Sequence, residues 1–268
     1  MKIGNKEFDL KNHVYVMGIL NVTPDSFSDG GRWNSLDAAL IHTEEMIADG
    51  ADIIDLGGES TRPGHIQITE QEEIDRVIPY IEALKTRFDV PVSIDTYKGT
   101  VAEAALAAGA DLLNDIWGLK YDNKIAEVAG KYNRPCCRMH NRNTTEYNDL
   151  MEDVLNDLRE SAGIALAHGV SEDNIILDPG IGFGKTYVQN LEVMNRLERL
   201  QELGYPVLLG TSRKSMIGLT LDLPADQRVE GTVATSVIGV MKGCAFVRVH
   251  DVKENVRAIR MTEAILHA

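Results

Sequence analysis

The sequence predicts a single α/β domain spanning residues 1–268, folded as a (β/α)8 TIM barrel. Two observations support this prediction. Short apolar runs alternate with helix-period patterns along the whole chain, which implies parallel strand pairing. No change of composition and no linker interrupts the alternation, and eight such units in about 250 residues are typical of a closed barrel. An open doubly wound sheet is the alternative, but eight strands that all end in polar residues fit closure better.

The first expected strand, residues 14–20, sets the pattern for the others. Its apolar run ends at Asn21, and carboxylates, hydroxyls, a proline and a glycine pair follow within residues 21–31. A plain turn needs only two or three such residues. Because binding groups concentrate on loops that a rigid scaffold holds, we expect this loop to be functional.

The remaining elements follow in chain order. Gly50 closes a helix over residues 36–47, and Thr69-x-x-Glu72 is a capping box that opens a helix to about residue 87. Further helices are expected near residues 99–108, shortly before 135, at 149–168, at 193–203, and at the end of the chain through 266. The other strands are expected at residues 51–56, 90–94, 110–113, 135–139, 175–177, 206–209 and 245–249.

Composition narrows the class of function. The net charge of −14 argues against nucleic acid and against an anionic membrane surface as partners. No segment resembles a signal peptide, and residues 14–20 are too few to span a membrane. Three cysteines give no disulfide framework, so we expect a cytoplasmic, reducing location. The sequence has none of the usual zinc-ligand spacings, so a zinc site has no support.

Polar residues follow nearly every expected strand. In a (β/α)8 barrel the loops after the strands form one face, where active sites lie. We therefore expect one mouth to be surrounded by Asn21, Thr61, Arg62, Asp95, Asn114, His140, Asp178, Lys214, Arg248 and His250.

The segment from Asp178 to Thr186, Asp-Pro-Gly-Ile-Gly-Phe-Gly-Lys-Thr, superficially suggests a nucleotide site. A P-loop requires a glycine where Pro179 stands, and the glycine spacing is not that of a dinucleotide fingerprint. A tight turn explains the glycines but not the acid. We interpret the segment as a carboxylate on a strand end, beside glycines that let a flat ligand approach the backbone.

Basic groups follow the last two strands. Residues 210–215, Gly-Thr-Ser-Arg-Lys-Ser, suit an oxyanion or a ring carbonyl, although a solvated face has a similar composition. Lys214 as a Schiff-base nucleophile is an alternative, but no adjacent residue obviously lowers its pKa. Arg248 and His250 share one strand face and suggest an anion site, the alternative being an ion pair with Asp251 or Glu254.

Two further pairs of residues are candidates for catalytic roles. Asp95 and Asp178 could form an acid/base pair, although their separation cannot be derived from the sequence. Cys136 and Cys137 are neighbours in one strand, so one of them is expected to face the core and neither is expected to be catalytic.

Taken together, these segments resemble bacterial dihydropteroate synthases over nearly the whole chain. Position 138 departs from the pattern, because Arg138 stands where an apolar residue is expected. The matching segments are residues 18–31, 55–64, 93–96, 113–115, 178–184, 210–215 and 248–251.

The resemblance implies a folate-biosynthesis transferase that is a sulfonamide target. It would condense 6-hydroxymethyl-7,8-dihydropterin diphosphate with para-aminobenzoate and release diphosphate. By resemblance, the pterin is held by Asp95, Asn114, Asp178 and Lys214, with Met139 near its ring.

The resemblance also distributes the other roles. Asn21, Arg248 and His250 take the diphosphate, and Asn21 also binds Mg²⁺. The aminobenzoate side is formed by Thr61, Arg62, Pro63, Phe183 and Ser215, and the residues implied in catalysis are Asp29, Arg62 and Lys214. A homodimer is expected by resemblance alone.

Two other functions remain compatible with the sequence. The pterin-binding barrel of a corrinoid-dependent methyltransferase has similar acid and amide strand ends, but it would not need residues 25–29 or 60–63, which are intact here. A non-catalytic homologue could keep the pterin pocket and lack turnover.

Overall fold

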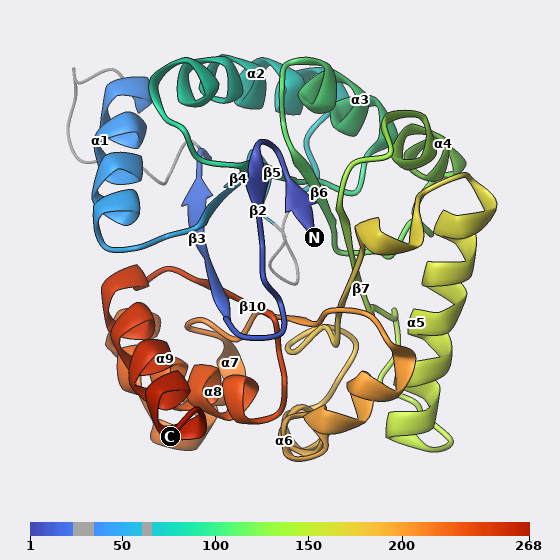
Figure 1. Cartoon of the computed structure of the whole chain (residues 1–268). Helices are drawn as coiled ribbons and strands as arrows, with labels where there is room; N and C mark the ends of the chain where they lie inside the picture. The colour runs from blue at the N-terminus through green and yellow to red at the C-terminus, as the bar shows by residue number, and fades with distance from the viewer. Residues whose placement is uncertain (24–34, 61–65) are drawn as a thin grey trace.

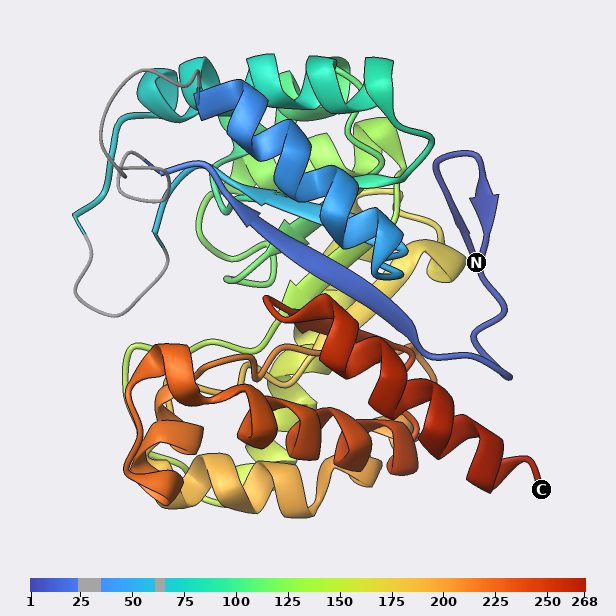
Figure 2. The same cartoon turned by 90° about the vertical axis from the view of Figure 1, so that its left-hand side faces the viewer.

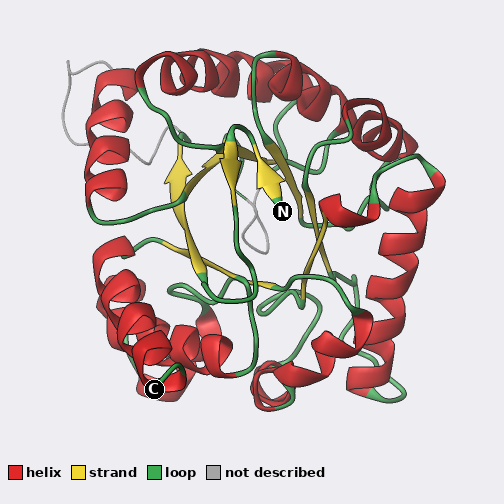
Figure 3. Cartoon of the chain, viewed as in Figure 1, coloured by secondary structure: helices red, strands yellow, loops and turns green. Residues whose placement is uncertain are grey.

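The computed structural model describes residues 1–23, 35–60 and 66–268. Eight parallel strands form one sheet in the order β8-β7-β6-β5-β4-β3-β10-β9. A parallel bridge between Leu177 and Val207 joins the two edges of this sheet and closes the barrel. Helices surround the strands on all sides (Figures 1 and 3). The predicted (β/α)8 barrel is confirmed.

The barrel strands are β3 (Tyr15–Asn21), β4 (Ile53–Gly57), β5 (Val92–Asp95), β6 (Leu112–Asp115), β7 (Cys136–Met139), β8 (Ile175–Asp178), β9 (Leu208–Leu209) and β10 (Phe246–Val249). The helices are α1 (Ser35–Ala48), α2 (Glu70–Arg87), α3 (Gly99–Ala107), α4 (Asn123–Tyr132), α5 (Leu150–Ala167), α6 (Tyr187–Asn195), α7 (Ser215–Leu221), α8 (Val229–Met241) and α9 (Val252–Leu266). Short 3₁₀ turns are η1 (Glu172–Asn174), η2 (Leu197–Leu203) and η3 (Ala225–Gln227).

The expected helix at residues 193–203 is wrong in its bounds. The α-helix α6 begins at Tyr187, after Thr186 and Gln189 form a capping box, and it ends at Asn195. The residues from Leu197 onward wind instead as the 3₁₀ turn η2, which ends at a left-handed Gly204. The capping box was visible in the sequence as Thr-x-x-Gln, the same signal that correctly placed the start of α2 at Thr69.

A small N-terminal hairpin, not anticipated from the sequence, closes one end of the barrel. Its strands β1 (Lys2–Ile3) and β2 (Lys6–Glu7) are antiparallel. Ile3 and Phe8 pack onto Phe246 and other apolar side chains inside the barrel. Figure 2 shows the hairpin and both termini on the side of the molecule opposite the carboxyl ends of the strands. The hairpin therefore seals the base and leaves the mouth to the polar strand ends.

Side chains alternate between the barrel interior and the helix layer, as parallel strands require. Cys137 belongs to the inner apolar cluster and Cys136 to the larger cluster between strands and helices. Both thiols are buried, and burial raises the pKa of Cys136 to about 11. This agrees with the expectation that neither thiol is a catalytic nucleophile.

Arg138, the residue that departs from the family pattern, is fully buried in β7. None of its side-chain nitrogens has a hydrogen-bond partner among the residues that the structure describes. Its across-strand neighbour is Asp115, whose carboxylate accepts from the backbone N–H groups of Trp117 and Leu119. Burial raises the pKa of Asp115 to about 6, and the Arg138 charge opposes that shift.

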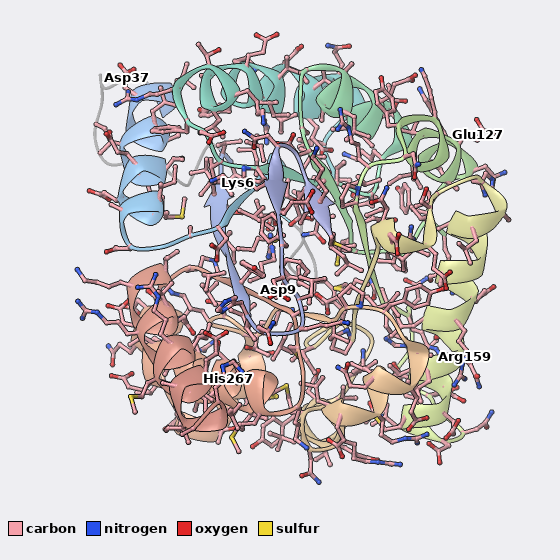
Figure 4. All side chains as sticks on the ribbon, viewed as in Figure 1. Lys6, Asp9, Asp37, Glu127, Arg159 and His267 are labelled. Carbon is pink, nitrogen blue, oxygen red and sulfur yellow. The ribbon has the colours of Figure 1, made fainter. Side chains whose placement is uncertain are left out.

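Charged side chains cover the outside of the helix layer. Figure 4 shows Asp37, Glu127 and Arg159 pointing away from the barrel, each from a different helix. Within the described ranges, no helix is both long and apolar enough to cross a membrane.

The packing of α4 against the end of α5 yields a stability prediction. A Cβ at Gly130 would lie 1.8 Å from the carbonyl oxygen of His168, whereas a Cβ at Gly163, on the exposed side of α5, would meet no atom within 4 Å. Gly130→Ala should lower the free energy of unfolding by more than about 1 kcal/mol through overpacking. Gly163→Ala should raise it by about 0.5–1 kcal/mol through helix propensity. Urea unfolding of the two variants measures both, and equal effects would contradict the close contact.

Candidate active site

The central feature of the barrel mouth is a buried arginine that joins two carboxylates. Arg248 of β10 donates from Nε to Asp55 Oδ2 at 2.5 Å and from Nη2 to Asp95 Oδ2 at 2.6 Å. All three side chains project inward from their strands, directly above the apolar layer. No described residue accepts a hydrogen bond from the remaining Nη1 group, which leaves that group for an anion at the mouth.

Asp55 is a site residue that the sequence interpretation missed. It is fully buried, and its Oδ2 also accepts from the Asn114 side-chain amide at 3.2 Å. The same oxygen thereby fixes one group from β6 and one from β10. The available signal was a single carboxylate at an inward position of an otherwise apolar strand, two residues before the strand ends.

Burial and mutual charge shift the pKa values of the Asp95 and Arg248 side chains. Burial raises the pKa of the Asp95 carboxyl, the Arg248 guanidinium lowers it, and the nearby Asp55 charge raises it again. For Arg248, burial opposes the charged form, but Asp55 and Asp95 outweigh burial and raise its pKa. One of the two oxygens of each acid remains buried without a hydrogen-bond partner among the described residues. These oxygens are acceptors for a donor that enters the mouth.

A second group of side chains lies beside Arg248, around Gly210 after the neighbouring strand β9. An ideal Cβ at that glycine would be 3.7 Å from Asp178 Oδ2, 3.9 Å from Arg248 Cβ and 4.0 Å from Lys214 Nζ. Asp178 Oδ1 accepts from the Gly180 backbone N–H at 2.7 Å. The structure thus brings the predicted acid of β8 and the predicted lysine together over a residue without a side chain.

Lys214 differs from its sequence interpretation in one respect. The sequence showed no neighbour that lowers its pKa, but burial lowers it to about 8, with Asp178 opposing the shift and Arg248 adding to it. Its ammonium donates to the Ile181 carbonyl and lies 4.7 Å from the centre of the Phe183 ring. Lys214 therefore contacts the glycine-rich turn after β8, the strand next to β9 where the barrel closes.

One wall of the mouth is apolar. Met139, at the end of β7, is buried and belongs to a small cluster that is separate from the two larger ones. The predicted residues Met139 and Phe183 are thus brought together, joined by side chains that the sequence did not single out. The other members of this cluster are Tyr97, Ile116 and Trp117.

Three other predicted residues lie nearer the rim. Asn21 ends β3, and its Oδ1 would be 3.3 Å from a Cβ on Gly57. His250 follows β10, and its Nδ1 lies 2.9 Å from the Ser212 hydroxyl. Ser215 is exposed at the first turn of α7. The ion pair suggested as an alternative for Arg248 is instead made by Arg213 with Asp251.

The second polar loop is anchored at its start by buried charges. Lys98 forms ion pairs with Glu59, before the loop, and with Glu73 of α2, at 2.8 Å in the latter case. It also donates to the Ile68 carbonyl at 2.8 Å. Because all three side chains are at least nine-tenths buried, this cluster fixes the exits of β4 and β5 relative to α2. Residues predicted for the site that lie outside the described ranges are Asp29, Thr61, Arg62 and Pro63.

The described part of the chain contains no preassembled cluster of metal ligands. Among the residues that the structure describes, no cluster of three or more His, Cys, Asp or Glu side chains could hold a metal ion. The Asn21 amide oxygen is compatible with Mg²⁺ of the kind that keeps most of its ligands from water and phosphate.

Comparison with known proteins decides the family. The family model described as pterin binding enzyme matches residues 17–250. The chain belongs to the pterin-binding enzyme family. A dihydropteroate synthase of Clostridium beijerinckii is 66% identical over 267 residues, covering 99% of each chain.

Solved structures of pterin-binding enzymes have the same fold. A dihydropteroate synthase of Clostridium difficile, determined in the presence of pteroic acid, is 54% identical, with a TM-score of 0.95, and covers 98% of this chain and 100% of that one. A Yersinia pestis dihydropteroate synthase in complex with a sulfonamide drug is 44% identical, with a TM-score of 0.93, and covers 100% and 98%.

Membership of the pterin-binding enzyme family makes Asp178 a testable anchor. Asp178→Asn should keep the Oδ1 bond to Gly180, so that the new NH₂ group takes the place of Oδ2 at the mouth. A pterin donor would then face another donor, and pterin affinity should fall about tenfold or more. Calorimetric titration measures this loss. The control is Asp111→Asn, a buried acid at the base that bonds the Val92 N–H and Lys85. Equal affinity in both variants would remove Asp178 from the site.

Proposed function

We propose that the chain catalyses the dihydropteroate synthase reaction. It joins 6-hydroxymethyl-7,8-dihydropterin diphosphate to para-aminobenzoate, giving 7,8-dihydropteroate and diphosphate in folate biosynthesis. The observation that carries this proposal is the pairing of Arg248 with Asp55 and Asp95 at the barrel mouth, beside Asp178 and Lys214. The 66% identity to a dihydropteroate synthase supports it.

The acids and the lysine suit a pterin ring. Its 2-amino group and adjacent ring nitrogen form a pair of donors, which a carboxylate such as Asp178 can accept. Asn114 offers both a donor and an acceptor. Lys214 supplies a donor for a ring carbonyl, and Met139 an apolar surface for the ring face. The buried carboxylates also favour the positive charge that the pterin gains as its carbon–oxygen bond breaks.

The basic side of the mouth suits the leaving group. Arg248 retains Nη1 for the diphosphate. His250 directly follows β10, and Asn21 ends β3, the strand that pairs with β10. Negative charge on the diphosphate grows in the transition state, so a fixed guanidinium lowers the barrier. Asn21 would hold Mg²⁺ together with water and diphosphate oxygens, and the ion would neutralise the leaving group.

The aminobenzoate would enter beside Phe183. We assign Thr61, Arg62, Pro63 and Ser215 to the same subsite, and roles in catalysis to Asp29, Arg62 and Lys214, from the resemblance of their segments. A sulfonamide drug is bound to the Yersinia pestis relative. We therefore infer that this chain is also a sulfonamide target, through the aminobenzoate subsite.

The relatives favour this function over both alternatives. The solved neighbours and the curated relative described above are dihydropteroate synthases, and none of these is described as a corrinoid-dependent methyltransferase or a non-catalytic binder.

The three cysteines are free and buried thiols, which supports a cytoplasmic location.

We also propose that the chain forms a homodimer through α6, α7 and α8, which contact one another. These helices carry only two charged residues, Glu192 and Glu230, in a chain whose charged content is 25%. An apolar patch that avoids charge is typical of an interface between identical subunits. The exposed apolar side chains on these helices are Val188, Leu191, Leu219, Leu221, Ile238 and Met241.

The function is tested by aminobenzoate-dependent release of diphosphate, measured against Mg²⁺ concentration. Arg248→Ala should lower dihydropterin affinity, since Asp55 and Asp95 lose their partner, and should depress turnover more, because the charge that Arg248 stabilises develops in the transition state. Asn21→Ala should raise the Mg²⁺ concentration needed for half-maximal turnover. Arg199→Ala, which removes a surface ion pair with Glu152 and Glu202, is the control. No diphosphate release by the wild type would refute the function, and full activity in chelator would refute the Mg²⁺ assignment.

The dimer is tested by sedimentation equilibrium. Leu219→Glu and Met241→Glu place a charge on side chains that are 66% and 65% exposed, and each should shift the protein toward the monomer. Met261→Glu makes the same change at a 61% exposed position of α9 and should leave the dimer intact. A monomeric wild type, or equal behaviour of all three variants, would contradict the assignment.

A further inference from the structure

The lysine of the glycine-rich segment after β8 is buried, which the sequence did not indicate. Lys185 occupies the position of the lysine in a P-loop-like Gly-Lys-Thr run, but it does not reach toward the mouth. The residue is 9% exposed, and its side chain turns back toward the turn formed by residues 180–184. The mechanism proposed above makes no use of this cation.

The ammonium of Lys185 has three acceptors at hydrogen-bond distance, matching its three protons. It donates to the carbonyl oxygens of Gly180 at 3.0 Å and Phe183 at 3.1 Å, and to Nδ1 of His140 at 2.8 Å. Both carbonyls belong to the turn that carries Phe183. The lysine therefore holds the two ends of one turn to a side chain that follows β7.

On its other side the histidine faces a carboxylate at ion-pair distance. Since Nδ1 accepts from Lys185, the neutral ring carries its proton on Nε2, which lies 3.1 Å from Asp157 Oδ2. Asp157 of α5 also accepts from Arg142 at 2.6 Å. Burial lowers the pKa of His140 to about 4, and the Lys185 charge adds to that shift. The neutral ring is thus the form that accepts from the lysine.

Close contacts on two sides also fix the position of the 180–184 turn. Gly180 has a positive φ of 66°, and a Cβ there would lie 1.9 Å from the His140 carbonyl oxygen. On the other side, the Gly182 N–H donates to Asn190 Oδ1 at 2.6 Å. The turn is pressed against the exit of β7 and fastened to α6, and Lys185 bonds its inner carbonyls.

We propose that Lys185 is a positioning residue that clamps the 180–184 turn and so places Phe183 for para-aminobenzoate. This inference rests on the proposed function. The Asp178 main chain is held by β8, where the His140 N–H donates to its backbone carbonyl at 2.9 Å, and only its Oδ1 bonds the turn, through the Gly180 N–H. Loss of the clamp therefore acts on the aminobenzoate side more than on the pterin side.

The test is Lys185→Met, which replaces the apolar stem of the lysine with one of similar shape and removes the donors and the charge. The KM for para-aminobenzoate should rise about tenfold, the factor that corresponds to the loss of about one net hydrogen bond. Dihydropterin affinity should change by less than about threefold, which is less than about half of the change in free energy expected on the aminobenzoate side. The control is Lys242→Met, which removes a surface lysine bound to Glu198 and the Asn195 carbonyl.

A second readout does not depend on activity. Titration of His140 followed by NMR should show a higher pKa in Lys185→Met than in the wild type, because a neighbouring positive charge is removed. If Lys185→Met does not fold, Lys185→Gln replaces it. Its amide can still donate to the turn carbonyls but carries no charge, so the His140 pKa should rise while the KM for para-aminobenzoate rises by less than the roughly tenfold change expected when all donors are lost.

The outcomes separate the clamp from the function. An unchanged KM for para-aminobenzoate in folded Lys185→Met, or equal losses for both substrates, would overturn the clamp, as would an unchanged His140 pKa. A wild type without diphosphate release would refute the proposed function instead, and the His140 titration would still report whether Lys185 contacts the ring.

Discussion

The structure of the mouth depends on one buried guanidinium. Arg248 lies between Asp55 and Asp95, and each of these acids would be costly to bury as a charge without it. The arginine comes from the last strand and the acids from β4 and β5, so the pairing also draws together strands from two sides of the barrel. Asn114 shares the Asp55 oxygen, which extends the same arrangement to β6. A single compensated cation thus organises side chains from four strands above the apolar base.

The other buried cations show different solutions to the same physical problem. Lys98 is surrounded by two carboxylates, and Lys185 by two carbonyls and a neutral imidazole. Arg138 has only a neighbouring charge at Asp115 and no hydrogen-bond partner among the described residues. The first two cations join loops that belong to different strands. The Arg138 side chain points from β7 toward the helix layer, at a position where family resemblance predicts an apolar residue, and it bonds no loop among the described residues.

Much of the fold could be predicted from the sequence because strand and helix periods are local signals. The strand ends at Asn21, Asp95, Asn114 and Asp178 were placed at one mouth by the geometry of the barrel alone. Asp55 was missed because an inward acid within an apolar strand looks, in sequence, like part of the strand. The contacts of Lys185 could not be predicted either, since its three acceptors come from the turn after β8 and from a histidine that follows β7. Contacts of that kind depend on how distant segments pack, which no short pattern encodes.

The hairpin at the base has a practical consequence for handling the protein. It closes the end of the barrel that carries Met1, and the last helix also finishes on that side (Figure 2). A fluorescent label, an affinity tag or a solid support attached at either end of this chain would therefore stand behind the barrel, and small molecules in solution would still have an open approach to the mouth. Surface-based binding measurements can use this orientation without engineering an internal attachment point.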